Sequence, residues 1–445
     1  MVPVIAIFDI GKTNKKFFLF NEDYKIVEEV SVHFEEIQDE DGFACEDVQA
    51  LSRWVIATLK KYLQSDIYDI RAINFSAYGA SFAHLNKYGN LVTPLYNYLK
   101  PYPKEAEALF YATYGTKEDI AICTASPALG NLNSGLQLYA LKHTKKSAFD
   151  KTAVSLHFPQ YLSYLISGKK YADITSIGCH TALWDFEKKQ YHHWVVAESI
   201  NEKLAPLYPS DTAMDVLYDG KALKCGVGLH DSSAAFIPYI QSVKEPFLLI
   251  STGTWCISMN AFNNSPLTKE ELQQDCLCYM TYEGISVKSS RLFAGYAHEQ
   301  VVKKLAEHFN VVTNYFEKIA YDENLLSAEE PDLAELTAFD PAVYDTYESA
   351  YINFVKQVVN VQKRSTDLVL NSSVKKIFID GGFAKNETYM QLLADAYPQV
   401  QVYAASVSQA TAMGAAMAIH AGWNHLELPD NIVSTRRYFA SGRDA

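Results

Sequence analysis

The chain has 445 residues, of which 49% are hydrophobic and 20% charged, and its formal net charge is −13. This length and composition are typical of a globular protein of about two to three domains. The acidic balance, without a basic stripe, argues against a protein that binds the nucleic-acid backbone. No apolar run reaches the length of a membrane span.

The seven cysteines are odd in number and scattered, which favours reduced thiols and a cytoplasmic protein. Cys276 and Cys278 form the one close pair, and no further metal ligands stand near them in the sequence. We therefore expect a structural role for the pair. The N-terminus enters a strand pattern directly, without the charged segment and cleavage site of a secretory signal.

The N-terminal half mixes strand and helix patterns. The first residues predict three strands joined by turns at Gly11 and Asn21, with the sequences VIAIFDIG, KKFFLFN and YKIVEEVSV. The elements predicted after them are a helix at Val48–Gln64, a strand in IRAINFSAYG, and helices at 104–115, 133–148 and 159–166.

A second block of elements opens near residue 236. It begins with a strand, a glycine turn and a strand in PFLLISTGTWCISMN, followed by a strand in GISVKSSRLF. Helices are then predicted at Ala297–Phe309 and Tyr344–Leu370. The last predicted elements are a strand, glycine turn and helix in KKIFIDGGFAKNETYMQLLADAY, a strand in QVYAAS, and a helix in SQATAMGAAMAIHAG that stops at Gly422.

The two halves repeat one arrangement. Asp9-Ile-Gly-Lys-Thr and Ser251-Thr-Gly-Thr each lie between two apolar strands. This weak internal repeat predicts two related α/β domains that face each other. Because no Pro-rich or low-complexity linker separates them, we expect closely packed domains at 1–235 and 236–445, with a hinge near residues 225–245.

The segment Gly11-Lys12-Thr13 looks like the end of a phosphate-binding P-loop, but the rest of that motif is missing. The upstream glycine position holds Ala6, and Asp9 stands where the phosphate would lie. After Thr13 the chain returns to strand sequence, whereas a P-loop enters a helix. We therefore exclude a P-loop and predict a β-hairpin with an acid near its tip.

The tip of this hairpin combines a carboxylate with hydrogen-bond donors. Gly11 permits a tight turn, and Thr13 and Asn14 offer donors. Positive charge is offered by Lys12, Lys15 and Lys16. Such a tip can hold a phosphate while Asp9 faces a hydrated Mg²⁺. A polar turn with a solvated Asp9 explains the segment equally well when it is taken alone.

Two further glycine turns bear on this choice. The second hairpin, Ser251–Thr254, favours phosphate binding, because one such hairpin per domain would clamp a nucleotide between them. Gly381 and Gly382 follow a strand and precede a helix, where a nucleotide can approach the backbone closely, although simple steric reasons also place glycines there. Asn386 either reads an adenine edge or caps the helix, and taken alone it favours the cap.

Asp231 carries the second candidate carboxylate. It precedes Ser232-Ser233-Ala234-Ala235, so it fits a helix N-cap that satisfies free N–H groups. It also fits a general base for a hydroxyl group at the domain interface. His230 beside it is more often a packing neighbour than a catalyst.

In order and spacing, these segments resemble the FGGY carbohydrate kinases of the actin-like ATPase superfamily, over nearly the whole chain. The segments that carry the resemblance are Asp9-x-Gly11-x-Thr13-Asn14, His230-Asp231-Ser232, Ser251-Thr252-Gly253-Thr254-Trp255 and Gly381-Gly382-x-x-x-Asn386. The sequences SAYGASFAHLNKYGNLVTPLYNY, STGTW and QATAMGAAM look closest to the rhamnulokinase and fuculokinase branch.

The resemblance implies two ribonuclease-H-like α/β domains with a cleft between them, and ATP- and Mg²⁺-dependent phosphorylation of a sugar hydroxyl. It implies that Asp231 is the catalytic base, and that Asp9 and Asp231 lie at the metal. The implied nucleotide-binding residues are Gly11, Thr13, Asn14, Lys16, Gly253, Thr254, Gly381, Gly382 and Asn386. The implied sugar-binding residues are Gly79, Ala80, Ser81, Phe82, Tyr98, His230 and Asp231.

The chain also departs from the pattern of this family. Lys12 stands where the family usually has Thr, and Lys16 replaces Arg, which keeps the charge but loses the planar fork. At the expected sugar wall, Ser81 replaces an Asp, and the usual Tyr-Arg-Asp reads Tyr98-Leu99-Lys100. Since buried polar groups discriminate between sugars, these changes leave the identity of the sugar open.

The expected function is therefore an ATP-dependent kinase for a small sugar, a ketose such as L-rhamnulose or L-fuculose, with pentuloses as further candidates. A homodimer is expected by analogy with relatives. The alternative is a weakened kinase homologue that binds a sugar or nucleotide as a regulator, although the presence of both Asp9 and Asp231 argues against it. An actin-like ATPase with a protein client would need an additional domain, for which the chain offers no room.

Overall fold

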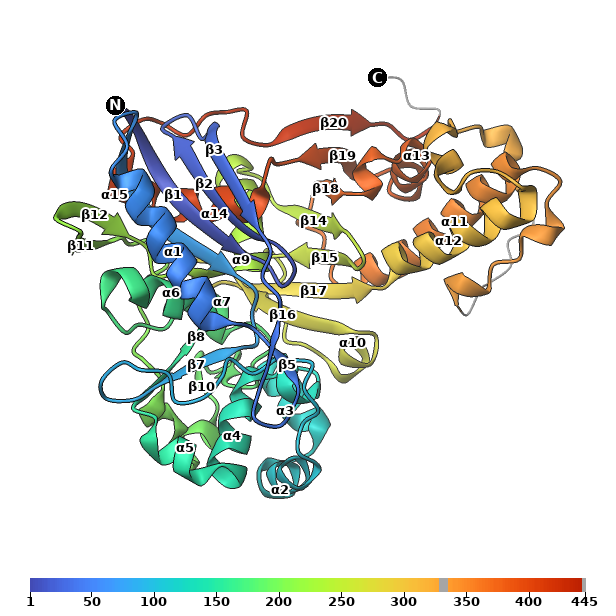
Figure 1. Cartoon of the computed structure of the whole chain (residues 1–445). Coiled ribbons are helices and arrows are strands. Elements are labelled where there is room, and N and C mark those ends of the chain that lie inside the picture. Colours follow the sequence, from blue (N-terminus) through green and yellow to red (C-terminus); the bar gives the residue numbers. More distant parts are fainter. Residues whose placement is uncertain (328–334, 442–445) are drawn as a thin grey trace.

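The structure is a computed structural model, and it describes residues 1–327 and 335–441. Two seven-stranded sheets form its framework (Figure 1). Each sheet belongs to one half of the sequence, and helices α2 to α5, within residues 104–151, lie apart from both large sheets, beside short strand pairs (Figure 1). None of the described helices combines the length and the apolar character that crossing a membrane would require.

The first sheet has the strand order β11-β12-β6-β1-β2-β3, and β13 pairs with β6 beyond this path. Strands β1 and β2 have nearly continuous apolar runs, and both of their faces are buried. Such runs suit strands in the interior of a sheet. The strands are β1 (Val2–Ile10), β2 (Lys15–Asn21), β3 (Ile26–Val32), β6 (Tyr68–Ala77), β11 (Met214–Tyr218), β12 (Lys221–Cys225) and β13 (Leu229–His230).

The second sheet has the order β16-β17-β15-β14-β18-β19-β20. As in the first sheet, a central strand pairs antiparallel with its hairpin partner and parallel with a later strand. The strands are β14 (Phe247–Thr252), β15 (Cys256–Asn260), β16 (Cys276–Met280), β17 (Ser286–Leu292), β18 (Lys376–Gly381), β19 (Gln401–Ser406) and β20 (Ser434–Tyr438).

Fifteen α-helices connect the strands within the described residues. In the N-terminal half they are α1 (Val48–Leu63), α2 (Lys104–Tyr114), α3 (Lys117–Thr124), α4 (Ser134–Thr144), α5 (Lys146–Lys151), α6 (Phe158–Ser167), α7 (Ile174–Ile177) and α8 (His193–Ala197). From residue 231 on they are α9 (Asp231–Ser242), α10 (Lys269–Gln273), α11 (Ala294–Phe309), α12 (Tyr347–Asp367), α13 (Glu387–Ala396), α14 (Ala410–Ala418) and α15 (His420–Trp423). Short strand pairs add β4 (Ile37–Gln38) with β5 (Ala44–Cys45), β7 (Phe82–Leu85) with β8 (Val154–His157), and β9 (Trp184–Asp185) with β10 (Gln190–Tyr191).

Helices α9 and α14 hold the two halves together, and they lie between the sheets in Figure 1. They share one apolar core with residues of both sheets, among them Ile7 and Leu249. The two helices touch backbone to backbone, because a Cβ added at Gly414 would lie 1.8 Å from the carbonyl oxygen of Ala234. Asn74 of β6 donates a hydrogen bond to the Ala415 carbonyl at 2.8 Å. The two halves are therefore closely packed, as predicted.

Most predicted elements are present, and four predicted helices need correction. The helix predicted at Tyr344–Leu370 is shorter by three residues at each end and spans Tyr347–Asp367. The helix at 133–148 is two helices that break at Lys145, whose backbone leaves the helical region. The helix predicted from Ala297 begins three residues earlier, at Ala294. The last predicted helix ends at Ala418, and Gly422 lies inside the short α15 and does not stop the helix.

The seven cysteines are free thiols, and Cys276 and Cys278 are buried on strand β16. The structural role predicted for this pair agrees with that position, since both side chains pack in the interior of the second half. The sequence prediction missed strand β16 itself, as well as the hairpin of β11 and β12 and the edge strand β20.

Candidate active site

The hairpin predicted to bind phosphate lies between β1 and β2, and its turn is closed by a hydrogen bond from the Gly11 N–H to the Asn14 carbonyl at 3.0 Å. Thr13 and Asn14 at the tip are exposed, so their donors are free to meet a ligand. Asp9 and Lys16 occupy opposite positions in the two strands. A carboxylate, an ammonium group and exposed donors therefore share one end of the hairpin.

Asp9 and Asp231 come from different segments but lie at the same edge of the first sheet. Strands β1 and β13 both run parallel to β6, and Ile10 and His230 are both paired with Ala77. Because the carboxyl ends of parallel strands meet at one edge, the two acids come close to each other. Burial, and after it the charge of Asp231, raise the pKa of Asp9 to about 7, with Lys16 acting in the opposite direction.

Asp231 is the first residue of α9, and the N-cap residue is His230. The prediction of Asp231 as the helix cap is therefore wrong by one position. Its carboxylate accepts hydrogen bonds from the backbone N–H of Ser232 at 2.6 Å and from the Ser232 hydroxyl at 3.3 Å. It also lines a cavity of 230 Å³ whose other walls include Ser251 and Met259 from the second sheet. Asp231 thus faces the C-terminal half of the chain.

His230 packs behind Asp231, and burial lowers its pKa against the effect of the Asp231 charge. Its Nε2 lies 3.3 Å from Asp231 Oδ1 and 3.1 Å from Cys179 Sγ. A Cβ added at Gly79 would lie 2.7 Å from His230 Cδ2, so Gly79 is the residue that leaves room for the ring. Gly79 therefore contributes to the position of His230.

The rest of the predicted sugar wall is fixed by local contacts. Ala80 has a φ of +61°, and its carbonyl accepts a hydrogen bond from Gln137 at 2.6 Å. Ser81 and Phe82 are fully buried, the first donating to the Tyr96 carbonyl at 3.2 Å. The side chain of Tyr98 is half-buried, and of these residues it is the one that combines a polar group with partial exposure.

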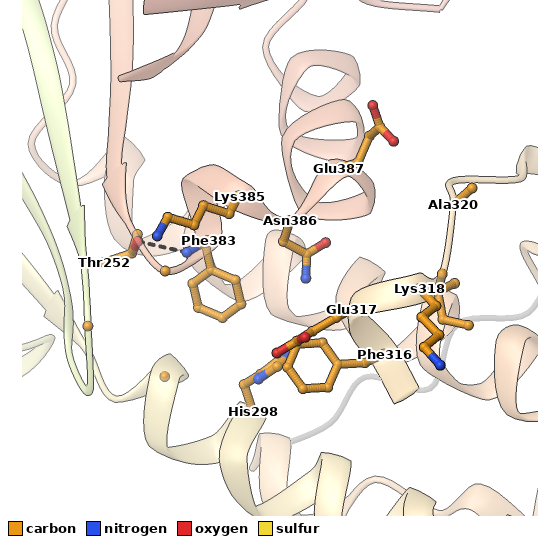
Figure 2. A pocket seen from close by; sticks show the side chains of 14 residues that line it. Thr252, His298, Phe316, Glu317, Lys318, Ala320, Phe383, Lys385, Asn386 and Glu387 are labelled. Atoms are coloured by element: carbon orange, nitrogen blue, oxygen red, sulfur yellow. Dashed lines mark hydrogen bonds between the residues drawn. The ribbon is translucent and has the colours of Figure 1, made fainter. Parts of the chain in front are cut away.

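A cavity of 780 Å³ opens in the C-terminal half (Figure 2). Of the residues predicted to bind a nucleotide, it is lined by Gly253, Gly382 and Asn386. Phe316 and Phe383 supply aromatic surface, as Figure 2 shows, and a volume of this size suits a nucleoside. The cavity therefore provides room for a nucleotide beside the second hairpin and the double glycine turn.

Gly381 and Gly382 lie in different surroundings, so a side chain would have different effects at the two positions. Gly381 has a φ of +94°, and a Cβ there would lie 1.9 Å from the Thr252 carbonyl oxygen. Gly382 has no atom within 4 Å of an added Cβ and donates its N–H to the same carbonyl at 2.9 Å. Gly381 is thus required by packing, whereas Gly382 leaves open space along the cavity. Gly253, at the tip of the second hairpin, is similarly open, with its closest neighbour 3.9 Å from an added Cβ.

Asn386 takes the helix-capping role and also lies at the wall of the cavity. Its Oδ1 caps α13 by accepting a hydrogen bond from the Tyr389 N–H at 3.0 Å, and its Nδ2 donates to the Tyr351 hydroxyl at 2.6 Å. The same hydroxyl lies 3.0 Å from His298 Nε2. The helix cap is therefore confirmed, and the side chain still borders the cavity. His298 and Phe316 were not predicted, because no sequence pattern places their elements beside the glycine turn.

Lys16 reaches from the first hairpin to the other half of the chain. Its Nζ lies 3.3 Å from the side-chain oxygen of Gln409, which precedes α14, and 3.6 Å from Glu29. Thr254, in the second hairpin, is exposed and accepts a hydrogen bond at its carbonyl from the Tyr296 N–H. The tips of both hairpins are thus exposed, and Lys16 connects the first hairpin with the C-terminal half.

Comparison with protein families gives two matches that together span most of the chain. Residues 4–236 match the N-terminal domain of the FGGY family of carbohydrate kinases, and residues 244–327 and 359–427 match the C-terminal domain of the same family. Among curated proteins, a rhamnulokinase of Bacteroides thetaiotaomicron is 24% identical over 60% of this chain and 56% of its own length. A rhamnulokinase of Oceanobacillus iheyensis is 21% identical over 87% of this chain and 86% of its own length.

Solved structures with the same fold cover nearly the whole chain. A carbohydrate kinase of Novosphingobium aromaticivorans has a TM-score of 0.78 at 20% identity, covering 99% of this chain and 97% of its own. A ligand-bound xylulose kinase and a gluconate kinase, both of Lactobacillus acidophilus, each have a TM-score of 0.79, at 16% and 15% identity, and each alignment covers 99% of this chain and 94% of the other. At these identities the likeness shows the fold.

Proposed function

This chain belongs to the FGGY family of carbohydrate kinases and is an ATP-dependent sugar kinase, and we propose that it phosphorylates a hydroxyl of a small ketose with Asp231 as general base. L-rhamnulose and L-fuculose are the first candidate substrates, because the curated relatives are named rhamnulokinases. Pentuloses such as xylulose and ribulose follow as further candidates.

The observation that carries the proposal is the position of Asp231. It begins a helix at the sheet edge shared with Asp9, and it lines a cavity whose opposite wall comes from the C-terminal half. A base in that position can take the proton of a sugar hydroxyl that approaches from the N-terminal half. Proton transfer of this kind contributes about 10²- to 10⁴-fold to a rate.

The nucleotide would lie in the 780 Å³ cavity, with its phosphates directed toward the two hairpins. The exposed N–H and hydroxyl donors of Thr13, Asn14 and Thr254 and the ammonium group of Lys16 would neutralise the charge of the transferred phosphoryl group. Domain closure over both substrates would exclude water and so limit ATP hydrolysis.

A Mg²⁺ ion fits the acidic pair, since two carboxylates lie at one edge and burial together with Asp231 raises the pKa of Asp9. Within the described part of the chain, no three His, Cys, Asp or Glu side chains gather into a complete metal cage. This suits Mg²⁺, which keeps several waters and takes one or two carboxylates together with substrate phosphates. Asp9 and Asp231 would hold it, and it would supply charge neutralisation at the phosphates.

The test is ADP release from ATP in the presence of single sugars, with neutral 6-deoxy-ketohexoses, pentuloses and polyols compared at equal concentration. We expect sugar-stimulated turnover for at least one ketose, and a sugar phosphate as the product by mass spectrometry. ADP release at the same rate with and without every sugar of the panel would refute the proposal, and would favour a protein that binds its ligand without phosphorylating it.

A further inference from the structure

The Lys12–Glu36 ion pair joins the first phosphate hairpin to the segment expected to line the sugar. Lys12 Nζ pairs with the Glu36 carboxylate and lies 5.8 Å from the centre of the Tyr78 ring. Glu36 Oε1 also lies 3.4 Å from the side-chain amide of Asn97, the residue before Tyr98. The pair thus bridges two segments that the sequence keeps far apart.

The pair and Asp231 act on one hydroxyl group, that of Tyr98. Burial raises the pKa of Tyr98, Lys12 lowers it, and Asp231 and Glu36 raise it further. The rings of Tyr78 and Tyr98 are 6.1 Å apart. Through their contacts with Tyr78 and Asn97, Lys12 and Glu36 therefore lie beside the segment that carries Tyr98, where the sugar is expected.

Glu36 is held in a fixed position by the loop that carries it. This acidic loop, residues 35–41 with the sequence EEIQDED, is fastened to Lys100 by Asp39 at 2.5 Å and by Asp41 at 2.7 Å. The side chain of Asp39 is fully buried. Withdrawal of the loop would separate a buried carboxylate from its partner, which is strongly unfavourable. The loop therefore presents Glu36 to the site in a preorganised position.

We propose that the Lys12–Glu36 pair determines specificity, favouring uncharged sugars and rejecting sugar acids, an inference that rests on the sugar-kinase function proposed above. Glu36 can accept a hydrogen bond from a sugar hydroxyl, and Lys12 can donate one. A carboxylate on the substrate would instead meet the carboxylates of Glu36 and Asp231, while the charge of Lys12 is already neutralised by Glu36. Like charges placed together in this way discriminate against one ligand class.

The test compares a neutral ketose with an aldonate of the same carbon number, in the wild type and in four variants. Glu36→Gln releases the charge of Lys12 and should raise kcat/KM for the aldonate relative to the ketose by roughly fivefold, mainly through KM. Glu36→Asp, which keeps the charge, should stay near the wild-type ratio. The double variant Lys12→Met/Glu36→Gln should lose the gain, because no free cation remains. Glu107→Gln, which breaks the exposed Lys117–Glu107 pair on α2 and α3, is the matched control and should leave the ratio unchanged.

Binding of both ligands is measured in parallel by calorimetry, so that the inference is tested even where turnover is absent. Failure of the wild type to phosphorylate any sugar would refute the proposed function, while a shift of the binding ratio in Glu36→Gln would still support the role of the pair. Equal use of aldonate and ketose by the wild type, or a ratio that Glu36→Gln leaves unchanged, would overturn the inference. So would an equal shift in Glu107→Gln.

Discussion

Replacing Asp9 by asparagine should stabilise the free protein, and the gain should grow with pH. Burial and the charge of Asp231 raise the pKa of Asp9 from 3.8 to about 7. Because the group in the unfolded chain ionises near its ordinary value, the folded protein binds an additional proton between the two values. The stability that this proton contributes is complete below the unfolded pKa and is lost as the pH rises through about 7.

The size of the effect follows from this difference in pKa. One pKa unit corresponds to about 1.4 kcal/mol, so the raised pKa of Asp9 costs about 4 kcal/mol at pH 8, where the folded group is ionised, and about 2 kcal/mol at pH 5.5, where it is protonated in the folded protein alone. Asparagine is uncharged at both pH values. The gain in the free energy of unfolding of Asp9→Asn should therefore be about 2 kcal/mol larger at pH 8 than at pH 5.5. Urea denaturation of the ligand-free protein, followed by tryptophan fluorescence, measures this difference.

Asp39→Asn is the control, because the pKa of Asp39 is lowered in the folded protein, whereas that of Asp9 is raised. Burial acts against the charged form of Asp39, but hydrogen bonds from Lys100 and from the backbone N–H groups of Phe43 and Asp41 outweigh it, so the pKa lies below its ordinary value. Its contribution to stability is present above the unfolded pKa and is lost only in more acidic solution. Asp39→Asn should therefore destabilise the protein equally at pH 5.5 and pH 8. A gain for Asp9→Asn that is constant or decreases between these pH values would refute the reasoning.

Three further predictions concern the nucleotide side of the site, and urea denaturation with ATP titration checks each of them. Gly381→Ala should destabilise the protein by several kcal/mol, because the methyl group would overlap the Thr252 carbonyl, whereas Gly382→Ala should keep the stability within about 0.5 kcal/mol and raise the KM for ATP. Asn386→Ala removes the cap of α13 and should cost about 1–2 kcal/mol, and a fully stable variant would contradict the cap. Lys16→Met should raise the KM for ATP about tenfold at nearly unchanged stability, so an unchanged KM would remove Lys16 from phosphate binding.

The parts of the fold that sequence predicts are those with a strong local pattern. The hairpin around Gly11 was predicted because two apolar runs flank a short polar turn, and the strand before Gly381 because an apolar run ends in two glycines. The edge strand β20 was missed because its sequence, STRRY, is polar and exposed on both faces. Its strand conformation comes from pairing with β19, which is a contact between distant residues.

In the candidate site, too, residues with a local sequence pattern were predicted, and contacts between distant residues were not. Asp9, Asp231 and Asn386 were found from their local sequence, and the structure places each at an edge or helix start that the sequence indicates. The partner of Lys12 could not be predicted, because Glu36 lies 24 residues away and reaches it through the acidic loop. The ion pairs of Lys100 with Asp39 and Asp41 could not be predicted for the same reason. Side-chain pairs of this kind depend on tertiary packing, which local patterns do not contain.

The central claim is that Asp231 is the general base of a sugar kinase, and Asp231→Asn tests it most directly. The variant keeps the size of the side chain and the start of α9, so calorimetry should show ATP and ketose binding within about threefold of the wild type. Sugar-phosphate formation at saturating substrates should fall by about 10²- to 10⁴-fold. A variant that binds both substrates and phosphorylates the ketose at the wild-type rate would contradict the account.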